Sequence, residues 1–377
     1  MKQRFIFQYV VLLGLLLSLG VSSGCGLFNR VQSDAVNTSS QVNDILIVGA
    51  PGVGSGTIGL LSPTTNIATS ANYVYSGVKA TIGITPQGVS LFGGDLYIVQ
   101  SGSSSLLVLD PATRTVKREM SLGSGNNPYE VGLLSATKGY VTNLVAHTVS
   151  VINPANSTST TCVTSTILLP TGNALAPFSS SNPSVAGPQG IAVDNSKVYV
   201  ALTNLDSSYQ PGGPGLVVVI NSMTNTIEKT VTLSYTNPQV VYKHPSYPNK
   251  LFVVETGSYS DGRGVLEIID TLTDQIVARL TVIGEPTSVA MGPNGKGYLV
   301  DSSGVVLIPF TLTGTTLAAL APIQVNSTGW ASEASVDSAG KIYVADRRQD
   351  KLFILDSNGT VLESYTVNAS PSVIVLQ

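Results

Sequence analysis

A short apolar run that opens with Lys or Asp recurs along this chain and constrains its fold more than any other feature. Its copies include "KGYVTNL", "KVYVALT" and "KIYVADR", and successive copies start 43 to 59 residues apart. The seven copies begin at Asp44, Asp95, Lys138, Lys197, Lys250, Lys296 and Lys341. A repeat of this period predicts a fold built from one supersecondary unit, because a single unit cannot bury its apolar faces alone.

Two further signatures recur around these runs. A second apolar run follows and often ends in Asp or Asn, which favour tight turns because their side chains hydrogen-bond the backbone just downstream. The predicted turn residues are Asp110, Asn153, Asn221, Asp270 and Asp356. A Pro-x-x-(Val/Ile) segment precedes most first runs, at Pro86, Pro128, Pro188, Pro238 and Pro286. A last copy, at Pro371, has no first run after it.

The alternation of apolar and polar residues between these turns predicts short antiparallel strands. Four strands make up each repeat, here named A (the Pro segment), B (the first run), C (the second run) and D, and this is the unit of a propeller blade. Seven units predict an all-β, seven-bladed β-propeller of four-stranded blades over residues 44–377. We expect the C-terminal copy, Ser372 to Gln377, to pair with the strand at Ile45 and close the ring, because closure protects sheet edges.

The tetrapeptide "YVTN", Tyr140 to Asn143, is followed by "VSVINPANS". Together they resemble the YVTN-type propeller repeat of bacterial extracytoplasmic proteins, and the resemblance extends over residues 44–377 through the seven copies. It implies the propeller fold. It implies no single activity, because the related propellers (NHL, gluconolactonase-like, lactonase and streptogramin-lyase types) include both binding proteins and enzymes.

Residues 1–24 have the pattern of a signal peptide, since Lys2 and Arg4 precede an uncharged, Leu-rich run that ends in small residues before Cys25. This ending resembles a bacterial lipobox, which implies a lipidated Cys25; a plain secretory signal is the alternative. Residues 25–43 are then predicted to be the lipidated Cys and a flexible polar tether. Gly26 stands where Asp favours inner-membrane retention, so we expect a lipid-anchored protein of the cell envelope, at the outer membrane or the cell surface.

The composition excludes several classes of partner. Charged residues make up only 11% of the chain, against about 25% in an average domain, and no Lys/Arg cluster matches a nucleic-acid surface. His147 and His244 are the only histidines and are expected on opposite faces, which excludes a multi-His metal site. We expect no cofactor, a monomer, and a protein, glycan or small molecule as partner. Cys162 is predicted to be a small buried hydrophobic residue.

Three long insertions are expected on one face of the propeller, where the D-to-A and B-to-C loops lie. They start at Thr164, Thr203 and Thr256 on neighbouring blades, and loops on a rigid scaffold often bind ligands. The candidate binding residues in them are Tyr209, Gln210, Tyr259, Asp261 and Arg263. The residue after the signature Pro adds a second group at the channel mouth, namely Gln87, Tyr129, Gln189 and Gln239. The first functional hypothesis is therefore a non-enzymatic binding scaffold that acts through this face.

A catalytic alternative depends on titratable residues near the central funnel. Glu130 and Glu333 lie two positions after the A-strand start in their repeats, and His147 lies in a B-to-C loop on the same face. Such groups can transfer protons if they converge on one substrate. A lyase or a lactonase-like hydrolase is therefore the second hypothesis, and a quinone-dependent oxidoreductase is the third.

Overall fold

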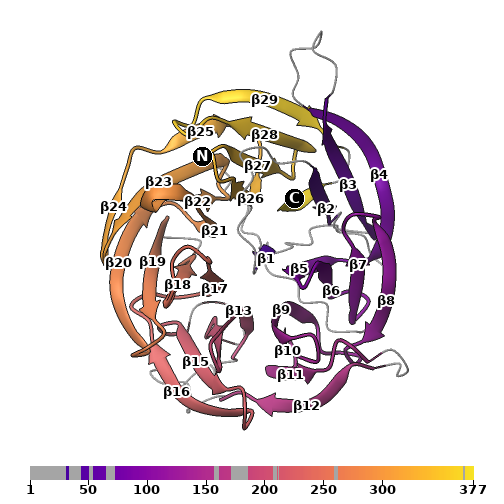
Figure 1. Ribbon diagram of the computed structural model, residues 1–377. Coiled ribbons are helices and arrows are strands. Elements are labelled where there is room, and N and C mark those ends of the chain that lie inside the picture. The colour runs from indigo at the N-terminus through magenta and orange to yellow at the C-terminus, as the bar shows by residue number, and fades with distance from the viewer. Residues whose placement is uncertain are drawn as a thin grey trace.

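The computed structural model describes residues 31–33, 44–50, 54–64, 73–156, 161–170, 186–206, 210, 212–258, 262–367 and 370–377. Within them, the strands form seven sheets that surround a central opening (Figure 1). Each sheet contains four antiparallel strands in the order A-B-C-D, so the predicted seven-bladed β-propeller is confirmed. No helix in this part of the chain is long and apolar enough to cross a membrane.

The strands of the seven blades follow the repeat. The A strands are β30 (Pro371–Leu376), β5 (Pro86–Phe92), β9 (Pro128–Ser135), β13 (Pro188–Asp194), β17 (Pro238–Lys243), β21 (Pro286–Met291) and β26 (Ala331–Val336). The B strands are β2 (Ile45–Gly49), β6 (Asp95–Gln100), β10 (Lys138–Asn143), β14 (Lys197–Leu202), β18 (Lys250–Glu255), β22 (Lys296–Asp301) and β27 (Ile342–Asp346). The C strands are β3 (Ser55–Pro63), β7 (Ser105–Asp110), β11 (Thr148–Ile152), β15 (Leu216–Asn221), β19 (Arg263–Asp270), β23 (Val305–Thr313) and β28 (Lys351–Leu355). The D strands are β4 (Tyr73–Ile84), β8 (Thr115–Ser121), β12 (Val163–Leu168), β16 (Thr226–Thr232), β20 (Gln275–Ile283), β24 (Thr316–Ala319) and β29 (Val361–Thr366), and β25 (Ile323–Asn326) also pairs with β23.

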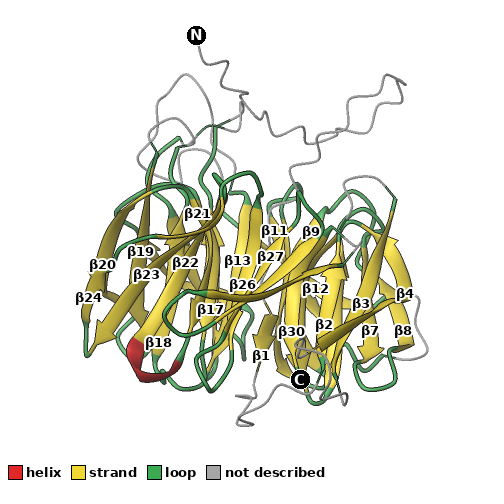
Figure 2. Cartoon of the chain, turned by 90° about the horizontal axis from the view of Figure 1, so that it is seen from above, coloured by secondary structure: helices red, strands yellow, loops and turns green. Residues whose placement is uncertain are grey.

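The two faces of the ring are named here by their loops. The D-to-A and B-to-C loops lie on the D–A face, and the A-to-B and C-to-D loops lie on the A–B face. The side view in Figure 2 shows the blades between these faces, with the 3₁₀ turn η2 (Pro293–Gly295) and the C-terminus at the A–B face.

Apolar side chains pack in seven clusters within the described residues, one at each interface between neighbouring blades. Strand β14 shows how alternation produces this arrangement. Val198 and Val200 pack toward blade 3, whereas Tyr199 and Ala201 pack toward blade 5. Both faces of each blade are therefore buried, because successive side chains of a strand point to opposite faces. Cys162 is fully buried between blades 2 and 3, which confirms its predicted hydrophobic role, and burial raises the pKa of its thiol to about 11.

The predicted turn residues close the C-to-D connections as expected. Asp110 Oδ1 accepts hydrogen bonds from the backbone N–H groups of Ala112 and Thr113, both at 3.0 Å. The Asn221 and Asp270 side chains accept the equivalent bonds in their blades. Asn153 and Asp356 also accept from the N–H two residues downstream.

The Lys-x-Tyr pattern of the B strands joins neighbouring blades at the A–B face. Lys197 Nζ and the Tyr199 hydroxyl each lie 2.7 Å from the Asp274 carboxylate, which belongs to the C-to-D turn of the next blade. Equivalent hydrogen bonds join Tyr140 to Ser222 and Asn225, and Tyr298 to Ser357. The repeated residues therefore fix each blade relative to the next.

The C-terminal strand closes the ring as predicted. β30 pairs antiparallel with β2, with Leu46 opposite Val375 and Ile47 opposite Ile374. The Gln377 N–H donates to the Asp44 carbonyl at 3.0 Å. One blade thus contains both ends of the described repeat region, and its inner strand is paired.

The structure adds one strand that the repeat does not contain. β1 (Val31–Ser33) lies in the central opening and pairs in parallel with β5 (Figure 1). A flexible tether was predicted over residues 25–43, and residues 31–33 form this strand instead. The rest of that stretch lies outside the described residues.

Candidate functional site

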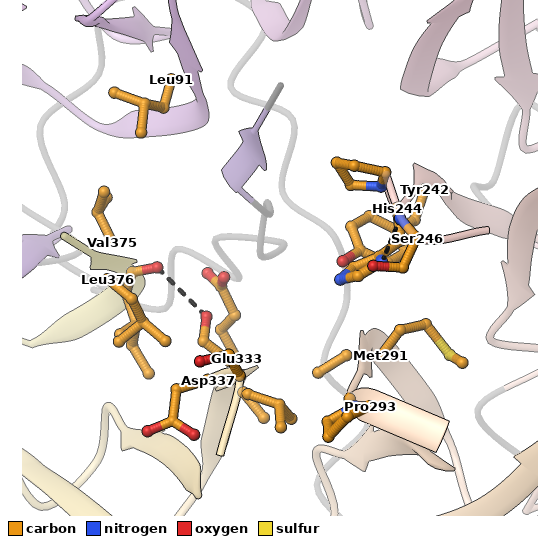
Figure 3. A pocket seen from close by; sticks show the side chains of 18 of the residues that line it. Leu91, Tyr242, His244, Ser246, Met291, Pro293, Glu333, Asp337, Val375 and Leu376 are labelled. Atoms are coloured by element: carbon orange, nitrogen blue, oxygen red, sulfur yellow. Dashed lines mark hydrogen bonds between the residues drawn. The ribbon is translucent and has the colours of Figure 1, made fainter. Parts of the chain in front are cut away.

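Two cavities lie at the A–B mouth of the central channel. One, here called the A–B cavity, has a volume of about 300 Å³ and lies between the ends of β5, β17, β21, β26 and β30. Leu91, Tyr242, His244, Met291, Glu333 and Leu376 are among its lining residues (Figure 3). The other, of about 340 Å³, lies beside it and shares Lys243 and Pro245 with it. Both cavities open on the face opposite the one predicted to bind ligands.

An aromatic group forms one wall of the A–B cavity. The His244 ring lies 5.9 Å from the Tyr242 ring and 5.4 Å from the Tyr247 ring, measured between centroids. The Tyr247 hydroxyl donates to the Gly292 carbonyl at 2.8 Å and accepts from the Gly295 N–H at 3.0 Å. These bonds hold the loop after β17 against the loop after β21, so this wall of the cavity is preformed.

Several charged groups around the two cavities are bound to partners inside the protein. Lys243 Nζ lies 2.8 Å from the Asp194 carboxylate, which is itself buried. The Asp337 carboxylate accepts from the Tyr343 hydroxyl at 3.1 Å and from the backbone N–H groups of Ala339 and Lys341, both at 2.9 Å. A carboxylate with three donors is held in its ionised form, which disfavours a proton-transfer role for Asp337.

Glu333 and His244 come from opposite walls of the same cavity (Figure 3). Glu333 is a predicted catalytic residue, and its side chain is only 2% exposed. His244 was predicted on the opposite face from the funnel and was given no role. Its Nδ1 accepts a hydrogen bond from the Ser246 N–H at 3.2 Å.

The other two predicted catalytic residues do not line this cavity. Glu130 is buried, and its Oε2 accepts a hydrogen bond from the Ile191 N–H of the neighbouring A strand at 3.0 Å. His147 is half-buried at the D–A face, where its Nδ1 accepts from the Gly187 N–H at 3.4 Å. Burial lowers the pKa of His147, which favours the neutral imidazole. The structure therefore gives Glu130 and His147 bonding partners in the framework.

The predicted channel-mouth residues Gln87, Tyr129, Gln189 and Gln239 are 9%, 2%, 2% and 2% exposed, respectively. They follow the first residue of their A strands, where the pairing with the B strand is irregular in every blade. A bulge of this kind re-aims the side chains next to it. These four residues are thus packed into the inner rim and expose little surface to a ligand.

Two of the predicted loop residues are described, and Tyr209, Tyr259 and Asp261 lie outside the described residues. Gln210 is exposed, and its N–H donates to the Asp206 carboxylate at 2.9 Å. The exposed Arg263 guanidinium lies 5.4 Å from the centroid of the Tyr235 ring, in cation–π geometry. Binding through this face stays a prediction.

The cavity residues Tyr242, His244 and Met291 were missed by the sequence reasoning. A signal was present, because the segment "YKHPSYPN" makes the A-to-B connection after β17 longer than the two-residue connections after β9 and β13. Among the described residues, no group of three or more His, Cys, Asp or Glu side chains is placed to hold a metal ion.

Solved structures share this fold. A protein from Lactobacillus plantarum superposes with a TM-score of 0.66 at 16% identity, over 89% of this chain and 100% of that one. Virginiamycin B lyase from Staphylococcus aureus gives 0.55 at 14% identity over 78% and 88% of the two chains. A streptogramin B lyase gives 0.53 at 13% identity over 76% and 86%. At these identities the likeness shows the fold alone. No protein-family model and no curated protein sequence matches the chain.

Proposed function

We propose that the protein is a non-enzymatic binding propeller, lipid-anchored through Cys25 outside the cytoplasm, whose ligand occupies the A–B cavity. The observation that carries this proposal is the bonding of the cavity's charged groups. Asp337 and the neighbouring Lys243 already have partners in the protein, so the walls offer mainly shape, aromatic rings and apolar surface. Preformed pockets with a few polar groups are typical of binding sites.

The size of the cavity limits the ligand. A volume of about 300 Å³ is at the lower end of ligand sites. The cavity therefore suits a small molecule, or one side chain of a protein or one sugar of a glycan that rests on the A–B face. The Tyr242, His244 and Met291 side chains would supply stacking and apolar contact.

Fragment binding tests this site. Ser246 is exposed and lines the cavity, so Ser246→Trp should fill the cavity without disturbing the core. Aromatic fragments screened by saturation-transfer NMR should bind the wild type and lose binding to Ser246→Trp. Leu272→Trp is the matched control, since Leu272 is 68% exposed on a C-to-D turn of the same face and does not line the cavity. Fragments that ignore Ser246→Trp and are lost with Arg263→Ala would place the site on the D–A face instead.

Lyase-type acid–base chemistry is the second candidate, and the presence of Glu333 and His244 in one cavity favours it. The fold likeness to two streptogramin-class lyases suggests a probe substrate, virginiamycin B. If the protein is a lyase, it should consume this probe, and Glu333→Gln should abolish turnover while the protein stays folded, because Gln keeps the shape and removes the titrating group. The binding proposal expects no turnover by the wild type. Turnover that depends on Glu333 would contradict it.

A further inference from the structure

The short strand β1 has a defined direction in the central channel. It pairs in parallel with β5, with Val31 beside Val89 and Ser33 beside Leu91. β5 begins with Pro86 at the D–A face and ends at the A–B face, where Leu91 lines the A–B cavity. The chain therefore enters β1 from the D–A side and leaves it toward the A–B side.

The position of the next strand agrees with this direction. β2 starts at the A–B face, where the preceding residue Asp44 lies 2.7 Å from Arg114 in the C-to-D turn of blade 2. The Asp44 carbonyl also accepts from the Gln377 N–H at the end of the chain. The exit from β1 and the start of β2 thus lie toward the same face, so the connection between them does not have to return through the ring.

We infer that the N-terminal segment threads the central channel and holds the propeller with its D–A face against the membrane and its A–B cavity facing away. The membrane part of this inference depends on the lipid anchor at Cys25 in the proposed function. The threading does not depend on it. The partner of the D–A face is accordingly a lipid surface.

Chain length makes the orientation specific. Cys25 precedes Val31 by six residues, which span at most about 20 Å when extended. Val31 is level with Val89, three residues inside Pro86, or about 10 Å from the start of β5. The anchored residue can then lie at most about 10 Å beyond that level. Without β1, the longer stretch from Cys25 to Asp44 would reach either face.

The D–A face carries apolar side chains that a lipid surface would cover. Three D strands end there in exposed residues, namely Ile84 at 47%, Leu168 at 78% and Ile283 at 89%. The A–B face exposes Met223 at 82% on a C-to-D turn, so apolar exposure alone does not distinguish the faces. The direction of β1 does, and Met223 provides a control of similar exposure.

A disulfide cross-link tests the threading. Gln32 pairs with Ser90, and adjacent strands bring paired Cα atoms within disulfide range. The full chain with Gln32→Cys and Ser90→Cys should form this cross-link under mild oxidation, detected by mass spectrometry of the joined peptides. Gln32→Cys with Ala290→Cys is the control, because Ala290 holds the same position in β21 of another blade. Equal cross-linking of the two pairs, or none with Ser90→Cys, would overturn the threading.

Thiol labelling on vesicles tests the orientation. Lipidated full-length protein with Ile283→Cys or Met223→Cys would be added to preformed phosphatidylethanolamine–phosphatidylglycerol vesicles and treated with a polyethylene-glycol maleimide. Cys162 is buried, which limits background labelling. Binding to the vesicles should slow labelling of Ile283→Cys several-fold and leave that of Met223→Cys nearly unchanged. Protection of Met223→Cys, or of neither, would overturn the orientation.

A longer tether provides a further control. A Gly/Ser linker of about 20 residues, with a mean span of about 25 Å, inserted between Arg30 and Val31 keeps both the anchor and β1. It should raise labelling of Ile283→Cys on vesicles toward that of Met223→Cys while the Gln32–Ser90 cross-link still forms. Protection that survives the linker would mean that the D–A face binds lipid by itself and that β1 does not set the orientation. Failure of the wild type to attach to vesicles would overturn the anchor and the orientation and leave the threading standing.

Discussion

At the scale of single residues, side chains at the ends of B strands hold the D-to-A loops in place. Asp346 accepts a hydrogen bond from the Trp330 N–H at 2.9 Å, and Glu255 accepts one from the Tyr235 N–H at 2.9 Å. Glu255 differs in that its side chain is fully buried near the Glu267 carboxylate. Burial, and then the charge of Glu267, raise the pKa of Glu255 to about 9. Glu255 is therefore a neutral acid in the folded protein at pH 7.

This raised pKa predicts a pH-dependent stability. An unfolded Glu titrates near about pH 4.3, so between that value and about 9 the folded protein holds a proton that the unfolded chain releases. The free energy of unfolding should then fall as pH rises, by up to about 1.4 kcal/mol per pH unit from this group. Glu255→Gln resembles the protonated acid and should flatten this slope in urea unfolding between pH 6 and 9. The control Glu228→Gln changes an exposed residue and should keep the slope; an unchanged slope in Glu255→Gln would contradict the assignment.

At the scale of elements, the inner A strands carry most of the demands of the ring. Each begins next to a bulge, and neighbouring A strands approach so closely that a Cβ on Gly190 would lie 2.4 Å from the Val241 nitrogen. The signature Pro is tolerated at the first strand position, where a missing N–H disturbs the ladder least. Proline, bulge and glycine together allow seven strands to converge around one axis.

Removal of β30 tests the closure of the ring. Val373, Ile374 and Val375 are each 1% exposed, and burial of each such side chain is worth about 1.5–3 kcal/mol. Their sum is comparable to the total stability of a typical domain, and the truncation also exposes the edge of β2. A chain without residues 371–377 should therefore lose cooperative thermal unfolding, followed by circular dichroism. Removal of Gln377 alone is the control, and a truncated chain that melts like the wild type would show that closure lies elsewhere.

At the scale of the whole molecule, the two faces have different properties. The A–B face has the cavities and the Lys-x-Tyr contacts between blades. The D–A face has the expected insertions and the Tyr235–Arg263 pair. A propeller anchored at its N-terminus and threaded by β1 would present the first face to ligands outside the membrane.

The anchor itself predicts the behaviour of a cysteine variant. Cys25→Ala should release the mature chain from the membrane fraction or leave it unprocessed, because the lipid would have no attachment site. Immunoblots of membrane and soluble fractions measure this. Cys162→Ala is the control, since it removes the other cysteine from the buried interface between blades and should leave the attachment unchanged. Equal membrane association of processed wild type and processed Cys25→Ala would contradict the lipid anchor.

The sequence alone determined the number of blades, the turn residues at Asp110 and Asp270, and the pairing of the C-terminal strand with β2. These features depend on local alternation and on turn chemistry, and the repeat states them seven times. Only the tertiary structure decided that Glu333 shares a cavity with His244, that Glu130 bonds the Ile191 N–H, and that residues 31–33 form a strand. Such contacts depend on how strand ends from distant repeats converge around the axis, which follows from bulges and side-chain direction and leaves no periodic pattern in the sequence.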